Sequence, residues 1–499
     1  MTYSDFTLTS PLSELEDGAA ALLTVTIVWH PDRSRIGEQF VGGAGGGIVE
    51  LNRFLPLFMH PGGDGLPLGH GGISRQPLRL VRDANDEVTL TLPASPMAVE
   101  VNGRIVKDAI HFSAAQIADG QILTLGRALV LCLHWMHRLP VPNSVPGFIG
   151  VGGASIAVRE QIQMVARTGM PVLLVGETGT GKEIAARAIH ALSGRGHAPL
   201  VAVNMAALGE AMAASELFGA APGAYPGAPA ARAGLFAQAD GGTLFLDEIG
   251  NAPAAVQPML LRAIEGGHYR PIGASEDRHS SARLIAASDQ DLDAAAFNQA
   301  LLHRLEGFVI RMPLLRQRRE DVGVLIVDLL RQQGIDADLP AALVAELAAH
   351  DWPGNVRQLS NVLQRAALVL REGGVPTLEQ LTGSARAKME EAPEPEPVVE
   401  QEPAVSRRRP SKLSDADVLE AMAGNDWNIQ AAAQALGISR PSLYKLLEDH
   451  PDIRRPESIA EDDIARAMAA SAGDIERCAA LLKTPAEALR RRWRLLRPN

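Results

Sequence analysis

Residues 171–183 read PVLLVGETGTGKE, and this stretch decides the fold of the middle of the chain. The apolar run Val172–Val175 predicts a strand, and a helical pattern, IAARAIHAL, follows the glycine-rich turn. Such a turn between a strand and a helix binds phosphates, because its backbone N–H groups surround the anion and a lysine neutralises it. We therefore expect phosphates to be bound by Gly176, Glu177, Thr178, Gly179, Thr180, Gly181, Lys182 and Glu183.

A second apolar strand ends in two carboxylates at TLFLDE, residues 243–248. In an α/β sheet, ligands bind at the carboxyl ends of the strands, so this strand would bring Asp247 and Glu248 to the phosphate site. Asp247 can hold Mg²⁺, and Glu248 can orient and deprotonate the attacking water. The two motifs together predict ATP and Mg²⁺ as cofactors.

Length and composition limit the remaining possibilities. A chain of 499 residues suggests about three domains. With 46% hydrophobic and 21% charged residues it has the composition of soluble globular protein. The net charge of −11 excludes a general attraction to nucleic acid, so any DNA contact needs a local basic patch. Cys132 and Cys478 lie too far apart in sequence to suggest a disulfide framework, and no apolar run is long enough to span a membrane. We expect a cytoplasmic location.

Changes in pattern divide the chain into five segments. Residues 1–146 predict an all-β domain, and residues 147–383 alternate strands and helices as in a parallel α/β domain. Residues 384–411 are rich in Pro and Glu and predict a disordered linker. Residues 412–450 and 456–499 predict two all-α units of the helix-turn-helix type.

Short apolar or alternating runs mark the strands of the first segment. Residues 41–47, VGGAGGG, predict a flexible loop between two of them. The expected strands are Leu22–Trp29, Leu78–Val81, Val88–Leu92 and Ala128–Leu133.

An internal repeat occupies the last segment. Residues 413–447 align without a gap with residues 459–493, at an offset of 46. Apolar positions coincide along the whole alignment, as Ile429 does with Ile475. A chance match between two Ala-rich helical stretches is one explanation, but the agreement through three expected helices favours tandem three-helix units.

The middle of the chain resembles the AAA+ domain of bacterial enhancer-binding proteins, which activate sigma-54 RNA polymerase. The resemblance implies an α/β P-loop NTPase fold with a helical lid. The matching stretches besides the phosphate loop are SELFG (215–219), ADGGTLFLDEIG (239–250), PLLRQRRED (313–321) and WPGNVRQL (352–359). This family also has Glu where Glu183 stands.

The resemblance implies three further roles in the ATPase site. Asn204 would restrain Glu248 until ATP is sensed, and Arg357 would contact the nucleotide of its own subunit. Arg304 would be an arginine finger that reaches the ATP of a neighbouring subunit. That last role implies a homo-oligomeric ring, usually a hexamer.

Several positions depart from the family pattern. The first finger position is Asn298 instead of arginine, and the first sensor position is Asp289 instead of asparagine, which predicts reduced or regulated hydrolysis. The loop that contacts sigma-54 reads GAFTGA in the family and GAYPGA here, so a proline replaces a threonine and fixes φ. The residues of this sigma-contact loop are Gly223, Ala224, Tyr225, Pro226, Gly227 and Ala228.

Residues 48–137 resemble a forkhead-associated (FHA) domain, a β-sandwich that binds phosphothreonine peptides. Arg53 and Arg75 could pair with the phosphate, Ser74 could donate to it, and Asn102 could hold the peptide backbone. Pro77 replaces the histidine that supports these loops in the family. The alternative is a β-sandwich that only docks proteins, with its arginines solvated.

Residues 413–447 resemble the Fis-type helix-turn-helix that ends most enhancer-binding proteins. The third helix would enter the major groove and present Arg440, Ser442, Tyr444 and Lys445 to DNA. The second unit has Lys483-Thr484 in place of the turn's Gly-Ile. Its basic last helix either grips phosphates or docks on another helix, with its arginines solvated.

The leading hypothesis is an ATP-dependent, DNA-binding transcriptional regulator, gated by a phosphorylated partner protein. Two alternatives stay open. The chain is either a DNA-binding regulator that uses ATP only to oligomerise, without remodelling sigma-54, or a phosphopeptide-binding scaffold with a non-catalytic core. Pro226 and Asn298 favour the first alternative, and the paired motifs at Lys182 and Asp247 count against the second.

Overall fold

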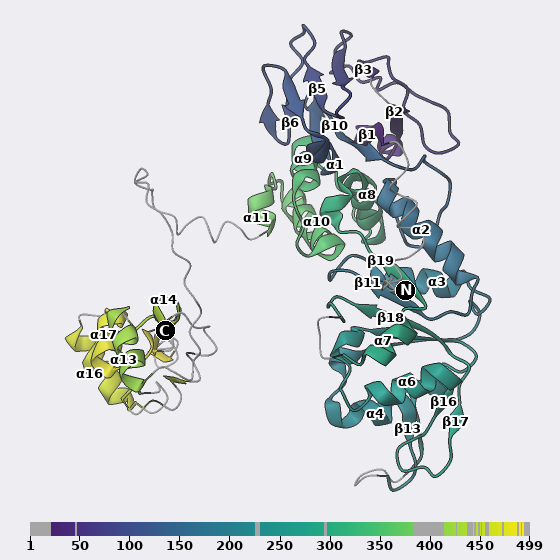
Figure 1. The fold of residues 1–499 in the computed structure, drawn as a ribbon. Helices are drawn as coiled ribbons and strands as arrows, with labels where there is room; N and C mark the ends of the chain where they lie inside the picture. Colours follow the sequence, from purple (N-terminus) through teal and green to yellow (C-terminus); the bar gives the residue numbers. More distant parts are fainter. Residues whose placement is uncertain are drawn as a thin grey trace, which may run out of the picture. The chain divides into compact units, whose positions relative to one another are not determined.

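The computed structural model describes two parts of the chain (Figure 1). One part comprises residues 21–382 without 45–46, 225–229 and 294–296, and it belongs to a compact unit of its own. The second comprises residues 414–493 without 426, 437–442, 444–445, 448–449, 451, 455–458, 472–473, 487–488 and 491. In neither part does a helix combine the length and the apolar character needed to cross a bilayer.

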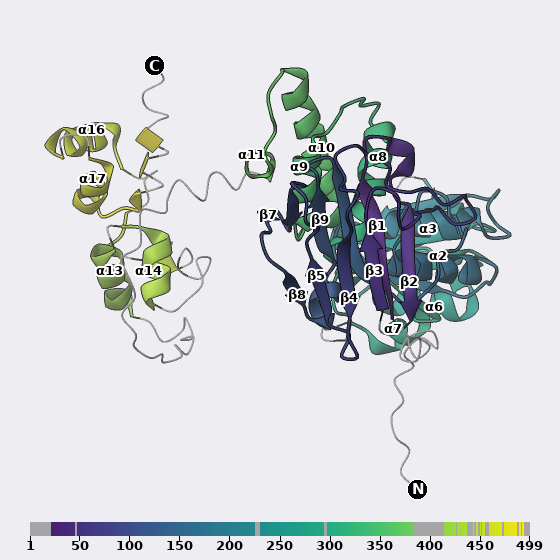
Figure 2. The same ribbon diagram turned by 90° about the horizontal axis from the view of Figure 1, so that it is seen from above.

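Two antiparallel sheets form the N-terminal domain, whose strands are drawn in purple and dark blue in Figure 2. One sheet has the order β2-β1-β10-β9-β6-β7, the other β3-β4-β5-β8, and both contribute side chains to one apolar core. The elements are β1 Leu22–Trp29, η1 Arg33–Arg35, β2 Gln39–Ala44, β3 Gly47–Leu51, β4 Leu78–Arg82, β5 Val88–Thr91, β6 Val99–Val101, β7 Arg104–Ile105, β8 Ile110–Phe112, α1 Ala114–Ala118, β9 Gln121–Leu125 and β10 Leu129–Met136.

The expectation of a loop at residues 41–47 is wrong. Gln39–Ala44 form β2, which pairs with β1, and β3 begins at Gly47. A Cβ atom on Gly42 would lie 2.9 Å from the carbonyl oxygen of Leu23 on β1. The glycine is therefore needed for a close backbone approach within the sheet.

The middle of the chain forms a parallel sheet of order β12-β15-β18-β11-β19, covered by helices on both faces. Alternate residues point to opposite faces: Leu173 and Leu246 pack with α4, α6 and α7, whereas Leu174 and Phe245 pack with α2 and α3. The elements are α2 Gly153–Ala166, β11 Val172–Val175, α3 Lys182–Ala191, β12 Leu200–Asn204, α4 Glu210–Phe218, α5 Leu235–Gln238, β15 Thr243–Asp247, α6 Gln257–Gly266, β18 Arg283–Ser288, α7 Gln299–Leu305 and β19 Phe308–Arg311. The short strands β13 Gly219–Ala220 and β14 Arg232–Ala233 pair, as do β16 His268–Tyr269 and β17 Arg278–His279.

The helices α8 Val322–Gln332, α9 Ala341–Ala349, α10 Asn355–Arg371 and α11 Leu378–Thr382 form a lid that shares one apolar core with the N-terminal domain. Side chains of β1 and β10, such as Trp29 and Cys132, pack among those of α8 and α9. A Cβ atom on Gly323 in α8 would lie 2.0 Å from the carbonyl oxygen of Val28. An interface this apolar and this close fixes the sheet domain to the lid.

The described residues of the second unit include two helix pairs around one apolar core. Its helices are α13 Asp415–Gly424, α14 Ile429–Leu436, α16 Glu461–Ala470 and α17 Ile475–Leu482. Ser414 caps α13, because its hydroxyl accepts from the N–H of Asp417 while the Asp417 side chain accepts from the N–H of Ser414. The expected linker at residues 384–411 lies outside the described residues.

Candidate functional site

The glycines of the loop between β11 and α3 have positive φ angles. Gly176, Gly179 and Gly181 have φ angles of 158°, 81° and 104°, and the last two lie in the left-handed region that favours glycine. Lys182 Nζ donates to the carbonyl oxygens of Gly176 at 2.5 Å and of Glu177 at 3.2 Å. Partial burial lowers the pKa of Lys182, while the carboxylates of Asp289 and Asp247 act in the opposite direction. These two hydrogen bonds thus hold the Lys182 side chain against the first two residues of the loop.

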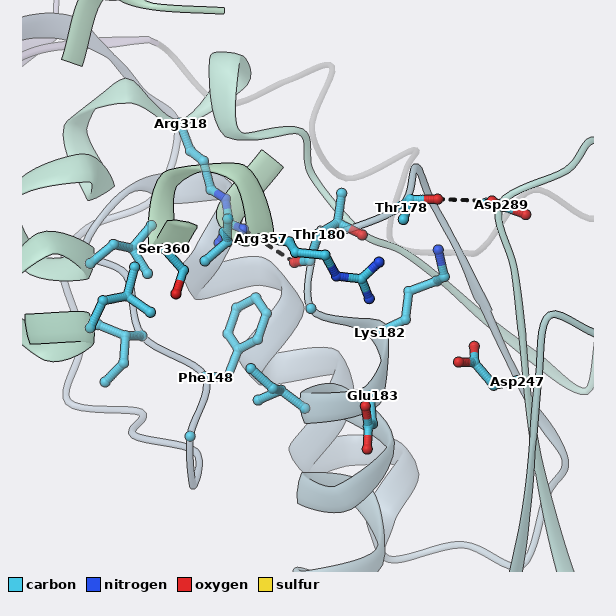
Figure 3. A pocket seen from close by; sticks show the side chains of 18 of the residues that line it. Phe148, Thr178, Thr180, Lys182, Glu183, Asp247, Asp289, Arg318, Arg357 and Ser360 are labelled. Atoms are coloured by element: carbon cyan, nitrogen blue, oxygen red, sulfur yellow. Dashed lines mark hydrogen bonds between the residues drawn. The ribbon is translucent and has the colours of Figure 1, made fainter. Parts of the chain in front are cut away.

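Three adjacent strands deliver the polar side chains of the site. β11 leads into the loop, β18 beside it leads to Asp289, and β15 ends at Asp247. Thr178 Oγ1 donates to Asp289 Oδ2 at 2.9 Å, as Figure 3 shows. Partial burial raises the pKa of Asp247, and the neighbouring Glu248 carboxylate adds to this. Glu248 itself has φ of 53°, an uncommon conformation outside glycine that is often found at functional sites.

The lid closes over the loop through residues that sequence reasoning did not single out. Asn355 Nδ2 donates to Glu177 Oε2 at 3.2 Å and to the carbonyl oxygen of Thr178 at 3.1 Å. Arg316 also pairs with Glu177 at 3.1 Å, and both bonds lower the pKa of that carboxylate. A Cβ on Gly179 would lie 2.4 Å from the carbonyl oxygen of Gly354. The WPGNVRQL and PLLRQRRED stretches contain these residues, but only the fold shows which atoms they contact.

Arg318 is the most deeply buried cation of the site. Its guanidinium donates to the carbonyl oxygen of Thr180 at 3.3 Å, and it lies 5.6 Å from the ring centre of Phe148 (Figure 3). Asp321 lies 3.9 Å away and accepts N–H groups of the segment that precedes α2. Burial lowers the pKa of Arg318, and the Asp321 carboxylate opposes that effect.

Between loop and lid lies a cavity of about 270 Å³. The residues around it include Lys182, Asp247, Glu248, Asp289 and Arg357, and Figure 3 shows Arg357 extending across the loop toward Lys182. Glu183 also lines the cavity, but it pairs with Arg187 one turn further along α3. The cavity has the glycine-rich wall and the cation of a nucleotide site.

Four expected residues are not among those that line this cavity: Gly176 and Glu177, which begin the loop, and Asn204 and Arg304. Asn204 ends β12 and lies in register with Asp247, and its side chain accepts from the N–H of Ala206. Arg304 lies on α7, is more than half exposed and pairs with Glu265 at 3.1 Å. The side chain of Asn298 caps α7 by accepting from the N–H of Leu301 at 3.1 Å, a role that its position in the sequence did not suggest.

Two of the residues expected to bind a phosphopeptide, Arg53 and Asn102, form side-chain hydrogen bonds within their own domain. The Arg53 guanidinium donates to the carbonyl oxygens of Gly71 and Ile73, and its backbone N–H donates to Ser74. The Asn102 side chain bonds to Ile122 N–H and to the Gln121 side chain on β9. The structure thus brings Arg53 and Ser74 together, whereas Arg75 is exposed.

Two sets of expected residues fall outside the described part of the chain. In the sigma-contact loop only Gly223 and Ala224 are described, and Tyr225, Pro226, Gly227 and Ala228 are not. The DNA-reading set Arg440, Ser442, Tyr444 and Lys445 also lies outside the described residues.

A glycine-rich phosphate loop, an acidic strand end and a helical lid define a P-loop NTPase domain of the AAA+ class. Residues 148–311 match the family described as the Sigma-54 interaction domain. Residues 316–397 match the AAA+ ATPase lid domain, and residues 418–449 match the bacterial regulatory protein, Fis family.

Relatives of known sequence agree with these matches. The transcriptional regulatory protein ZraR of Salmonella typhimurium is 38% identical over 380 residues, which cover 72% of this chain and 83% of ZraR. The Nif-specific regulatory protein of Azotobacter vinelandii is 39% identical over 292 residues, covering 56% of this chain and 54% of that protein. The chain therefore belongs to the family of sigma-54-dependent transcriptional regulators.

Among solved structures, NtrX from Brucella abortus in complex with ATP is similar. It is 26% identical with a TM-score of 0.43, and the match covers 62% of this chain and 70% of NtrX.

Proposed function

We propose that this chain hydrolyses ATP and uses that reaction to activate transcription by sigma-54 RNA polymerase. The observation that carries the proposal is the convergence of Lys182, Asp247 and Asp289 on one cavity beneath Arg357. The loop N–H groups and Lys182 would hold the phosphates, and Arg357 would contact them from the lid. Asp247 offers the hard carboxylate oxygen that Mg²⁺ prefers, and a bound Mg²⁺ would neutralise phosphate charge.

Glu248 would orient the attacking water and accept its proton. Its left-handed backbone places it just beyond Asp247, at the carboxyl end of the sheet. Asn204 ends the neighbouring strand in register with Asp247, and from there it would restrain Glu248. Glu248 would thus act only when a nucleotide changes that arrangement.

The active form would be a ring, with six subunits as the expected number. Arg304 lies outside the cavity of its own chain and is more than half exposed, as a finger directed at a neighbour must be. Its ion pair with Glu265 lies at the surface, where such pairs contribute at most about 1 kcal/mol. Arg304 would therefore lose little free energy when it leaves Glu265 and binds the nucleotide of a neighbouring subunit.

The C-terminal unit would anchor this ring on DNA in the cytoplasm, through Arg440, Ser442, Tyr444 and Lys445. This set follows the described helix pair α13–α14 along the chain. In a helix-turn-helix the next helix enters the major groove, and the N-terminal residues of that helix contact base edges.

A second candidate function is DNA-bound oligomerisation driven by ATP, without remodelling of sigma-54. Asn298 favours it, because this residue is committed to capping α7 and supplies no finger cation. Pro226 in the sigma-contact loop favours it as well. A third candidate, a phosphopeptide-binding scaffold with a non-catalytic core, is opposed by the cavity around Lys182 and Asp247.

The N-terminal domain would bind a phosphothreonine peptide in the manner of an FHA domain. Its two sheets around one core support this assignment. Since Arg53 bonds to loop carbonyls, Arg75 and Ser74 would contact the phosphate directly while Arg53 and Asn102 shape the loops. Loss of phosphothreonine-peptide binding in an Arg75→Ala variant, with retained folding, would support the assignment. Unchanged binding would oppose it.

One experiment separates the candidate functions. ATP turnover by the full chain is measured with and without DNA, in parallel with open-complex formation by sigma-54 holoenzyme. Turnover with open complexes supports the first function, and turnover without them supports the second. Failure to bind nucleotide leaves only the scaffold.

If ATP is turned over without open complexes, a Pro226→Thr variant tests whether the sigma-contact loop is the cause. If it gains open-complex formation while its ATP turnover stays the same, the loop alone limits contact with sigma-54. An Ala230→Thr variant just beyond the loop serves as the matched control, and it should gain nothing.

A further inference from the structure

The C-terminal unit contains two helix pairs whose bounds repeat. Helix α13, Asp415–Gly424, and helix α16, Glu461–Ala470, begin and end at an offset of 46 residues, the offset of the sequence alignment. Helix α14, Ile429–Leu436, and helix α17, Ile475–Leu482, do the same. The Fis-type match ends at residue 449, so it does not extend to the second pair.

The buried positions of the two helix pairs also correspond. Val418 and Met422 in α13 are buried, and so are their counterparts Ile464 and Met468 in α16. The turn after the second helix has Lys483 with φ of 49° where the first copy has a glycine. Agreement in helix bounds and in buried positions is what duplication of one three-helix unit would produce.

The expected DNA-reading positions differ between the copies. In the alignment, Ala486 replaces Arg440 and Ala488 replaces Ser442. An alanine can make only an apolar contact with DNA, so the second copy lacks two of the polar side chains expected to contact bases or phosphates in the first.

The start of the third helix in the second copy is also covered. Thr484, Pro485 and Ala486 are buried, and Ala486 N–H donates to the carbonyl oxygen of Trp427 at 3.1 Å. Trp427 belongs to the connection between α13 and α14, so one copy covers the other. The N-terminal end of a recognition helix must be accessible to enter the major groove, and this end is not.

We propose that residues 459–493 are a second helix-turn-helix copy that packs on the first and does not read bases. Both copies contribute to a single apolar core, in which Trp427 and Leu443 lie together with Cys478 and Leu489. The partner of this surface is thus the first copy of the same chain. The claim that the second copy does not read bases rests on the DNA-binding function proposed above, whereas the claim that it packs on the first copy does not.

The first test concerns packing and does not involve DNA. Ala486→Arg restores the residue of the first copy at a side chain that is 7% exposed. Hydrogen exchange of the full chain should become at least tenfold faster in both α13–α14 and α16–α17, because the two pairs share a core. Ala480→Arg, on the exposed face of α17, is the matched control and should leave exchange unchanged. Unchanged exchange in Ala486→Arg would overturn the packing role.

The second test concerns base reading. A short duplex, enriched from random-sequence DNA by the full chain, serves as the probe in anisotropy titrations. Arg440→Ala should weaken binding about tenfold to a hundredfold and relax the enriched sequence. Arg490→Ala, in the third helix of the second copy, should leave the enriched sequence unchanged. A changed sequence preference in Arg490→Ala would refute the proposal. No effect of Arg440→Ala would instead refute the DNA function proposed for the first copy, leaving the exchange result to stand.

Discussion

His134 Nδ1 lies 4.0 Å from Glu320 Oε1, and both side chains are buried where the N-terminal domain meets the ATPase domain. His134 Nε2 lies 2.8 Å from Thr26 Oγ1 within its own domain. On the other side, Glu320 directly precedes Asp321, which contacts Arg318 and so leads to the phosphate loop. The pair therefore lies on a continuous path of contacts between the two domains.

The pH dependence of stability follows from the buried Glu320. Burial raises the pKa of Glu320 to about 8, the Asp321 carboxylate adds to this, and Arg318 opposes it. The folded protein thus keeps a proton that the unfolded chain loses near its ordinary pKa of 4.5, so stability falls as pH rises from 4.5 to about 8. Burial lowers the pKa of His134 to about 4, which costs stability only below its ordinary value of 6.5.

Between pH 6.5 and 8 the effect of Glu320 is therefore separate from that of His134. A Glu320→Gln variant should gain stability relative to the parent as pH rises through this window, by at most about 1.4 kcal/mol per pH unit and by less as pH approaches 8. Denaturant unfolding at several pH values measures this difference. Parallel curves for the two proteins would contradict the prediction.

Because α8 lies so close to β1, adding one methyl group at Gly323 should strongly lower the stability of the protein. Gly323→Ala would place a Cβ 2.0 Å from the Val28 carbonyl oxygen, and we expect a loss of about 1–3 kcal/mol in unfolding free energy. Gly153→Ala, at the start of α2, is the matched control because its Cβ would meet only Met136 Cγ at 3.9 Å. The control should be neutral or slightly stabilising. Equal stabilities of the two variants would show that the domains are not held this tightly.

Binding and hydrolysis of ATP should separate at two residues of the cavity. Lys182→Ala removes the phosphate cation, and we expect nucleotide affinity to fall at least tenfold. Glu248→Gln keeps the shape and removes the base, so turnover should fall about 10²- to 10⁴-fold with affinity almost unchanged. Titration with a fluorescent nucleotide and a phosphate-release assay measure the two quantities. Full turnover in Glu248→Gln would assign the base to another residue.

Action of Arg304 across subunits is testable by mixing. Arg304→Ala alone should lose about 10³-fold or more in turnover while it still binds ATP. Lys182→Ala subunits retain Arg304, so adding them to Arg304→Ala subunits should restore part of the turnover. If the mixture is no more active than the sum of its components, Arg304 does not act in trans.

Asn298 caps α7, and it stands where the family has the first finger arginine. Asn298→Arg removes the cap of α7, which should cost about 0.5–2 kcal/mol in stability, yet it should raise ATP turnover by restoring the finger cation. Asn298→Asp preserves the cap and adds no cation, so both quantities should stay at parental values. A gain in turnover with Asp would rule out a cation effect.

Local sequence patterns located much of the nucleotide site. The glycines before Lys182 and the apolar run before Asp247 determine a loop and a strand by conformational preference alone. The strand at Val172–Val175 lies where the pattern predicted it. The glycines at residues 41–47 led to a wrong prediction of a loop, because glycine is favoured both where strands approach closely and where the chain is flexible.

The sequence by itself determined which segments become strands, phosphate loop and capped helices, since each of these depends on residues a few positions apart. Only the tertiary structure decided that Asn355 holds Glu177, that Asn298 caps α7 and that the sheet domain shares its core with the lid. Those contacts join residues far apart in the chain. They arise from the packing of preformed elements, and no local preference encodes such packing.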